Sequence, residues 1–184
     1  MGRLFHAIAL GLAGAGIVHI AALLLVPHFA SNDAWSRIAA LGPEHDFALV
    51  EPAGRSSSGV IEVHDPEFAI AACRFDLGGG PVHVTAELDL RFWSVSIFND
   101  RGQSIYSFND RNSSSGALDL AIATPVQMVE LRKDLPDAFA DSIFVEADLS
   151  RGMVVLRLFE PDPGNRQAAS AMLDGAACAP YPLQ

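Results

Sequence analysis

The sequence predicts a mainly β protein, an antiparallel β-sandwich or partial barrel with a few short helices, preceded by one N-terminal transmembrane helix. Two observations predict the sheets: apolar and polar residues alternate in the central segment, and short runs of this kind recur between turn signals. A third predicts the membrane helix, because residues 4–26 are an apolar run without Asp, Glu, Lys or Arg. We therefore expect an anchor over residues 4–26, a juxtamembrane helix and linker over 27–44, and a β-rich domain over 45–184.

The apolar run is long enough to cross a bilayer. At about 1.5 Å per residue, a helix over residues 4–26 extends roughly 34 Å, against about 30 Å for the hydrocarbon core. A long signal peptide is the alternative, because Arg3 precedes the run, but cleavage after Ala30 would need a small residue where His28 stands. We expect a retained anchor with the N-terminus inside and the domain outside.

Small residues recur every four positions along the expected anchor. Ala7, Gly11 and Ala15 line one stripe of the helix, with His19 on the same stripe. Small residues at this spacing let two helices approach closely in lipid, and the contact offers a polar partner to the histidine. The stripe predicts a paired anchor, although Gly and Ala are common in membrane helices.

A separate short helix is expected just beyond the anchor. Ser31, Asn32 or Asp33 supplies its N-cap, and Gly42 followed by Pro43 ends it.

The domain is then expected to begin with a strand and a helix. The strand covers Val60–Val63, and the helix takes Asp65 as its cap with Pro66 at its first position.

The centre of the chain has the period of a strand. Apolar residues occupy even positions from Val82 to Leu90 and odd positions from Trp93 to Ile97. The change of parity predicts a bulge or bend near Arg91.

More strands complete the expected domain, and they cover Ser104–Phe108, Ala117–Ile122, Val126–Arg132, Ile143–Leu149 and Met153–Phe159. A tight turn joins the last two, with Gly152 in the positive-φ conformation that a hairpin requires. A final helix leads to Cys178.

The chain has two cysteines, Cys73 and Cys178, and their separation fits no metal-binding motif. In an oxidising compartment the pair predicts a disulfide that clamps the C-terminal tail onto the middle of the domain, and two buried thiols are the alternative.

The charge is strongly negative and lies outside the anchor. The chain has a net charge of −10, and every charged residue except Arg3 lies beyond Val26. This charge argues against nucleic acid as a partner and against electrostatic attachment to anionic lipid.

The tetrapeptide Phe-Asn-Asp-Arg occurs twice, from Phe98 and again from Phe108. The first copy lies between two expected strands and reads as a turn. The second follows a strand, where binding groups are often displayed, and it predicts a binding surface. That surface comprises Tyr106, Asn109, Asp110, Arg111 and Asn112. The alternative is an Arg-carboxylate pair and capped turns that only hold the loop.

No catalytic motif, cofactor motif or metal-ligand set appears in the sequence. The histidines are not spaced for zinc, the loop after Asp110 departs from a calcium loop, and the serine and glycine runs match neither a hydrolase elbow nor a phosphate loop. We expect no cofactor and no catalytic residue. The alternative is an enzyme whose fold pairs Asp110 with Glu87 or Asp89.

Several segments together resemble a known family. They are "GAGIVHIAALLLVP", "AWSRIAALGP", "CRFDL", "GPVHVTA", "FWSVSIFNDRGQSIYSFNDR" and "ELRKDLP". They are similar to the short membrane-anchored proteins of Gram-negative bacteria assigned to domain of unknown function twelve-fifty-four. The resemblance implies an inner-membrane anchor, a periplasmic β-rich domain, and association with a membrane protein of a sister family, domain of unknown function twelve-fourteen.

The expected function is that of a periplasmic envelope protein, anchored in the inner membrane, which binds a partner or forms a complex without catalysis. The alternative is a carboxylate-dependent enzyme acting on an envelope glycan or lipid-linked substrate.

Overall fold

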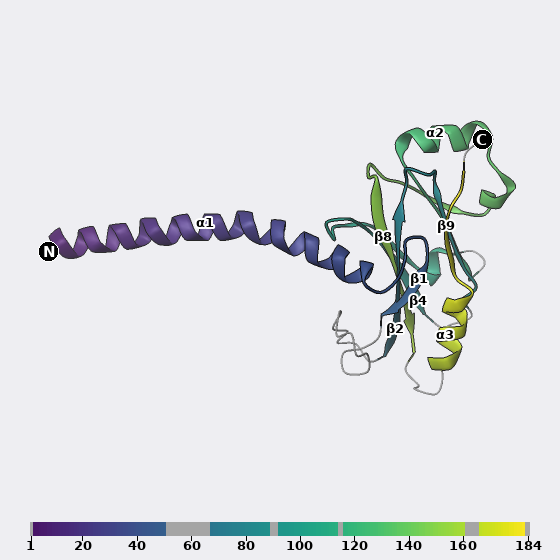
Figure 1. Cartoon of the computed structure of the whole chain (residues 1–184), viewed down its shortest axis with the longest axis horizontal. Coiled ribbons are helices and arrows are strands. Elements are labelled where there is room, and N and C mark those ends of the chain that lie inside the picture. The colour runs from purple at the N-terminus through teal and green to yellow at the C-terminus, as the bar shows by residue number, and fades with distance from the viewer. Residues whose placement is uncertain (1, 51–66, 89–91, 114–115, 161–165, 183–184) are drawn as a thin grey trace.

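The computed structural model describes residues 2–50, 67–88, 92–113, 116–160 and 166–182. It has a long N-terminal helix attached to a domain of two sheets (Figure 1). The helices are α1 (Gly2–Ala39), α2 (Pro125–Lys133) and α3 (Arg166–Asp174), with 3₁₀ helices η1 (Asp110–Asn112) and η2 (Asp137–Phe139). The strands are β1 (Phe47–Val50), β2 (Phe68–Asp76), β3 (Val82–Ala86), β4 (Trp93–Asn99), β5 (Ser104–Asn109), β6 (Leu118–Ala123), β7 (Ile143–Glu146), β8 (Arg151–Phe159) and β9 (Ala177–Pro180).

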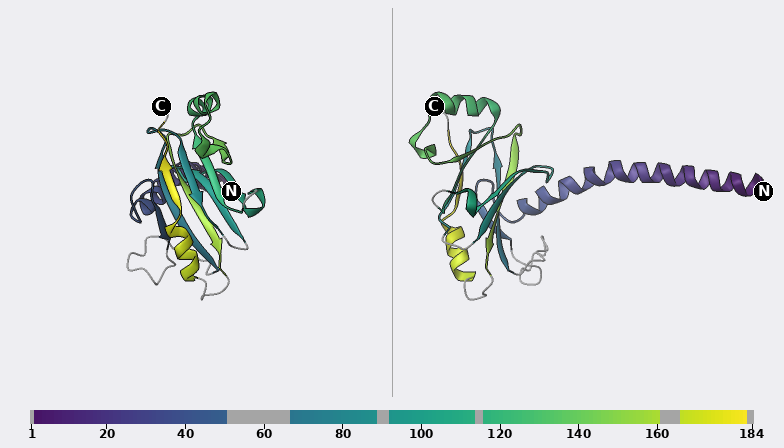
Figure 2. Two further views of the ribbon diagram at one scale, coloured as in Figure 1. Left: turned by 90° about the vertical axis from the view of Figure 1, so that its right-hand side faces the viewer. Right: turned by 180° about the vertical axis from the view of Figure 1, so that it is seen from behind.

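The predicted fold class is confirmed. One sheet has the order β1-β2-β8-β4-β5 and the other the order β7-β6-β3-β9. All pairs are antiparallel except β6 with β7, which are parallel. The chain between these two passes through α2 and η2, and a parallel pair requires such a crossover. α1 leaves the domain on the side opposite β9 and α3 (Figures 1 and 2).

The core lies between the two sheets and is built by alternation. Trp93, Val95 and Ile97 of β4 are at most 1% exposed, while Ser94 and Ser96 point to the other face. Val82 and Val84 of β3 are fully buried in the same cluster. The predicted period of the central strands is therefore confirmed, with β3 ending at Ala86 and Arg91 outside the described residues.

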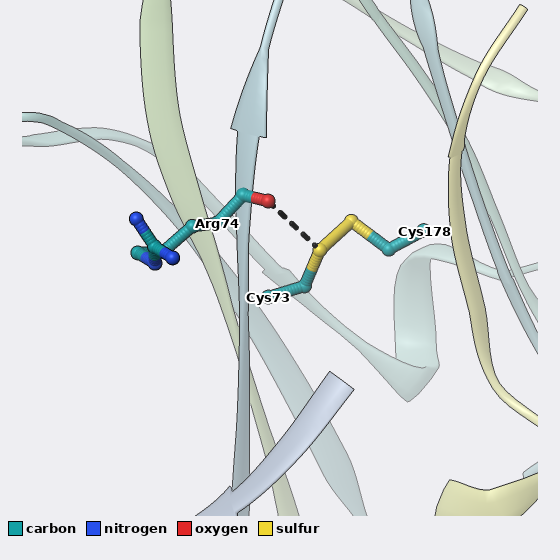
Figure 3. The surroundings of a disulfide bond; sticks show 3 residues. All are labelled: Cys73, Arg74 and Cys178. Atoms are coloured by element: carbon teal, nitrogen blue, oxygen red, sulfur yellow. Dashed lines mark hydrogen bonds between the residues drawn. A yellow bond between two sulfur atoms is a disulfide. The ribbon is translucent and has the colours of Figure 1, made fainter. Parts of the chain in front are cut away.

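The predicted disulfide is also confirmed. Cys73 of β2 and Cys178 of β9 are bonded, so the bridge joins the two sheets and fixes the C-terminal strand (Figure 3). Both cysteines are within the main core cluster and at most 2% exposed. The Arg74 side chain points away from the bridge, as alternation along β2 requires (Figure 3).

The expectation of a separate juxtamembrane helix was wrong. α1 continues without a break from Gly2 to Ala39, so the anchor and the following segment form one helix. Pro27 does not end it, and a proline inside a helix removes one backbone hydrogen bond without necessarily breaking the helix. The part beyond Val26 is a helical extension of the anchor, which we call the stalk (residues 27–39).

The expected helix beginning near Asp65 was also wrong. Residues from Phe68 onward form β2, in which Ala71, Cys73 and Phe75 are fully buried in the core. The Asp-Pro-Glu sequence resembles a helix start, but the residues that follow pair with β1 and β8 and bury their apolar side chains in the core. Asp65, Pro66 and the expected strand Val60–Val63 lie outside the described residues.

The segment Val126–Arg132, expected as a strand, is helix α2. Thr124 is its N-cap and forms a capping box with Gln127, and Pro125 occupies the first turn. These are strong helix-start signals. Met128 is buried on the face of α2 that packs against the outer face of the four-stranded sheet, at β6.

The role expected for Gly152 was wrong. It lies inside β8, and positive φ among the described glycines occurs at Gly80, Gly102 and Gly116 instead. Gly152 is required by close packing, since a Cβ there would lie 2.5 Å from the Phe98 carbonyl oxygen.

Candidate functional site

The open edge at β5 is the most exposed part of the five-stranded sheet. Among the described strands β5 pairs only with β4, and its first four residues are exposed. Ile105 is 41% and Tyr106 is 45% exposed. β5 has six residues and no charge or proline, whereas β1, β7 and β9, the other sheet edges, have four residues each. Short strands, charges and prolines are the usual protection of an edge against pairing, so β5 is the edge best able to accept a partner.

The predicted binding residues occupy β5 and the η1 turn that follows it. Asn109 caps η1 by accepting a hydrogen bond from the Arg111 backbone N–H at 3.2 Å, and Asn112 accepts one from the Asn109 N–H at 3.4 Å. These two amides therefore maintain the turn. Tyr106 and Arg111 are exposed, and one shielded carboxylate oxygen of Asp110 has no hydrogen-bond partner in the described residues. The five residues thus lie on one strand and the turn that follows it.

The first Phe-Asn-Asp-Arg copy forms the β4–β5 turn, as the sequence predicts. The Asn99 side chain accepts hydrogen bonds from the backbone N–H groups of Arg101 and Gln103 at 3.0 and 2.9 Å. Gly102 has φ of 76°, which favours glycine. Asp100 accepts a hydrogen bond from Arg151 of β8 at 3.2 Å.

A polar cluster on the outer face of the four-stranded sheet was not predicted. His83 Nε2 lies 2.9 Å from Asp119 Oδ1, and Ser142 donates a hydrogen bond to the same oxygen. The ring of Phe139 lies 4.7 Å from the His83 ring, centroid to centroid. Alternation along β3 places His83 on the outer face, but sequence gives no signal that Asp119 and Ser142 meet it.

This cluster does not have the geometry of a nucleophilic triad. In a triad the serine donates to the histidine, and the carboxylate binds the other ring nitrogen. Here Ser142 donates to Asp119, and the same His83 nitrogen approaches both residues, at 2.9 and 3.5 Å. The cluster instead ties the start of β7 to β3 and β6.

An open cavity of about 450 Å³ lies beside this cluster. It is lined by Thr85, Ala86, Glu87, Ala117, Leu118, Asp119, Asp141 and Gly175. Glu87 is therefore near two carboxylates, but Asp110 is not among the lining residues, and Asp89 lies outside the described residues. The described residues contain no group of three His, Cys, Asp or Glu placed to hold a metal ion.

The stalk is fastened to the outer face of the five-stranded sheet. The Trp35 ring is contacted by the guanidinium groups of Arg74 and Arg151, each 5.4 Å from the ring centroid. Arg74 also donates hydrogen bonds to Glu44 at 3.3 Å and to the Gly42 carbonyl at 3.1 Å. Arg74 thus contacts three parts of the connection between anchor and domain, at Trp35, Gly42 and Glu44.

The anchor is not buried by any other part of the chain that the structure describes. Residues Gly2–Val26 are long and apolar enough to cross a membrane, and none of this span is buried. A Cβ at Gly11 would meet no atom within 4 Å. The stripe of Ala7, Gly11, Ala15 and His19 is therefore open to lipid or to another helix.

Comparison with known proteins supports the fold and no function. The sequence matches no protein-family model and no curated protein. The structure is similar to the crystal structure of the VPA0106 protein from Vibrio parahaemolyticus, with a TM-score of 0.55 and 13% identity over 86% of this chain. The match covers 40% of the Vibrio chain. A weaker similarity, with a TM-score of 0.41 and 16% identity, links 62% of the chain to 32% of an uncharacterised protein from Burkholderia cenocepacia. The chain thus shares its fold with part of a longer bacterial protein.

Proposed function

We propose that the protein is an anchored, non-enzymatic module that forms a complex with another membrane protein in the periplasm. The observation that carries the proposal is the open β5 edge with its adjoining turn, displayed by a domain that is fastened to its stalk. A partner strand can add to such an edge through backbone hydrogen bonds, with side-chain contacts providing specificity. Tyrosine and arginine are enriched in protein interfaces, and the site contains Tyr106 and Arg111.

The anchor and the disulfide support the proposed location. An apolar N-terminal helix suits the bacterial inner membrane with the N-terminus in the cytoplasm, and a buried disulfide suits the oxidising periplasm. The partner we propose is the sister-family membrane protein implied by the sequence resemblance. The small-residue stripe, with Gly11 and Ala15 at its centre, is its contact within the membrane.

An enzyme acting on an envelope glycan or lipid-linked substrate is the second candidate. The cavity containing Glu87, Asp119 and Asp141 favours it, since paired carboxylates perform glycoside chemistry. Asp119, however, is already engaged by His83 and Ser142. We therefore place partner binding first.

Replacing Asp110 and Arg111 together by Ala should weaken capture of the partner while the domain remains folded. Asn109 and Asn112 are retained because their side chains maintain the turn. The full-length protein is extracted in mild detergent at native expression, and the copurifying membrane proteins are identified. Circular dichroism checks the fold.

A matched control removes one acidic and one basic side chain from α2. Glu130 and Lys133 form an exposed ion pair at 2.7 Å, and their double Ala variant should capture the partner as the parent does. If the Asp110 and Arg111 variant captures the partner as well as the parent does, the partner binds to another surface. Unfolding of that variant alone would mean that the turn is structural.

A further inference from the structure

The turn between β4 and β5 lies beside the stalk. Arg151 connects the two, because its guanidinium contacts the Trp35 ring and donates to Asp100 in the turn. The turn, drawn in teal, is on the same side of the domain as α1 in opposite views (Figures 1 and 2). The domain therefore directs this turn toward the membrane in which α1 is anchored.

Side-chain hydrogen bonds hold the turn, which presents one cation. Asn99 holds it through hydrogen bonds from two backbone N–H groups and donates a third hydrogen bond to Gln103 at 2.8 Å. Asp100 is held by Arg151, while the Arg101 side chain is exposed at the tip. A preorganised turn loses little conformational entropy when its tip binds.

The length of the stalk places the turn close to the lipid headgroups. Trp35 is nine residues beyond Val26, which corresponds to about 14 Å along a helix. The headgroup region extends roughly 5 to 8 Å beyond the hydrocarbon core. The span Gly2–Val26 has 25 residues. As a helix, its length exceeds the thickness of the hydrocarbon core by about 7 Å. A membrane helix that is too long in this way tilts. A tilt of α1 toward the turn would bring the turn closer to the headgroups, and the arginine side chain would extend across part of the remaining gap.

We propose that the β4–β5 turn rests on the bilayer and that the Arg101 guanidinium binds phosphate oxygens of the phospholipid headgroups. The planar guanidinium suits phosphate recognition because it donates two parallel hydrogen bonds. Zwitterionic phospholipids supply this phosphate, so the contact is compatible with a domain whose net charge is negative. This contact goes beyond partner binding. Together with the anchor and Trp35, Arg101 would fix the rotation of the domain above the membrane.

The test uses the full chain in nanodiscs of phosphatidylcholine that contain a lipid with a spin-labelled headgroup. Both native cysteines are bonded, so an introduced cysteine is the labelling site. A fluorophore at Ser104→Cys, next to the turn, should be strongly quenched. The same label at Val126→Cys on α2, which is 74% exposed, should be weakly quenched.

The role of Arg101 is tested in the Ser104→Cys background. Arg101→Glu should relieve much of the quenching, whereas Arg111→Glu, the same change in the second Asn-Asp-Arg copy, should leave it unchanged. Equal quenching at Ser104 and Val126, or quenching that is insensitive to Arg101→Glu, would overturn the proposal. Partner capture is measured separately on the Arg101→Glu variant, so failure of the headgroup contact is distinguishable from failure of the proposed complex.

Discussion

Replacing Cys73 and Cys178 together by Ala should lower the free energy of unfolding of the domain by about 4 to 5 kcal/mol. The bridge joins residues 105 positions apart and restricts the unfolded chain over that loop. Typical domains are stable by roughly 5 to 15 kcal/mol, so this loss would leave little stability. Denaturant unfolding of the full-length protein in detergent, under oxidising conditions, measures the difference from the parent.

Reduction provides the control for this measurement. Cys73 and Cys178 are 0% and 2% exposed, so a reductant should reach the bridge only when the parent unfolds. The parent unfolded in reductant should then match the double variant. A loss below about 1 kcal/mol would contradict the account, because the loop-entropy estimate for a bridge of this span is several times larger.

Gly152→Ala should destabilise the domain by about 2 to 3 kcal/mol, the upper range for overpacking. Its new Cβ would lie 2.5 Å from the Phe98 carbonyl oxygen and 2.8 Å from Phe75 Cζ. Phe75 is fully buried, and a backbone carbonyl has little freedom to withdraw. The midpoint of denaturant unfolding should therefore fall.

Gly175→Ala is the matched control for this substitution. The nearest atom to its Cβ would be the Met172 carbonyl oxygen at 3.6 Å, an ordinary contact. Equal stability of the two alanine variants would show that the close approach at Gly152 is not what requires glycine there.

The fold class could be predicted because alternation and turn signals are local. The alternation from Trp93 to Ile97 matches the buried face of β4, and the Ser104–Phe108 strand matches β5 within one residue. One error arose where two local signals conflict. In Val126–Arg132 the apolar residues suggested a strand, while the Thr124–Gln127 capping box started a helix.

The candidate site could be predicted only where it is continuous in the sequence. Tyr106 and Arg111 lie on one strand and its following turn, so the strand pattern alone places them together. His83, Asp119 and Ser142 meet through the pairing of β3 with β6 and the crossover to β7. Contacts of that kind depend on sheet order, which no local pattern in one sequence specifies.

The central claim is that the β5 edge is where the partner binds, and photo-cross-linking in native membranes tests it most directly. A photoreactive phenylalanine analogue replaces Tyr106 in the full-length protein, and a second variant carries it at Val126, exposed on α2. Illumination should yield a cross-linked product containing another membrane protein from position 106 and none from position 126. No product from position 106, or equal products from both positions, would contradict the account.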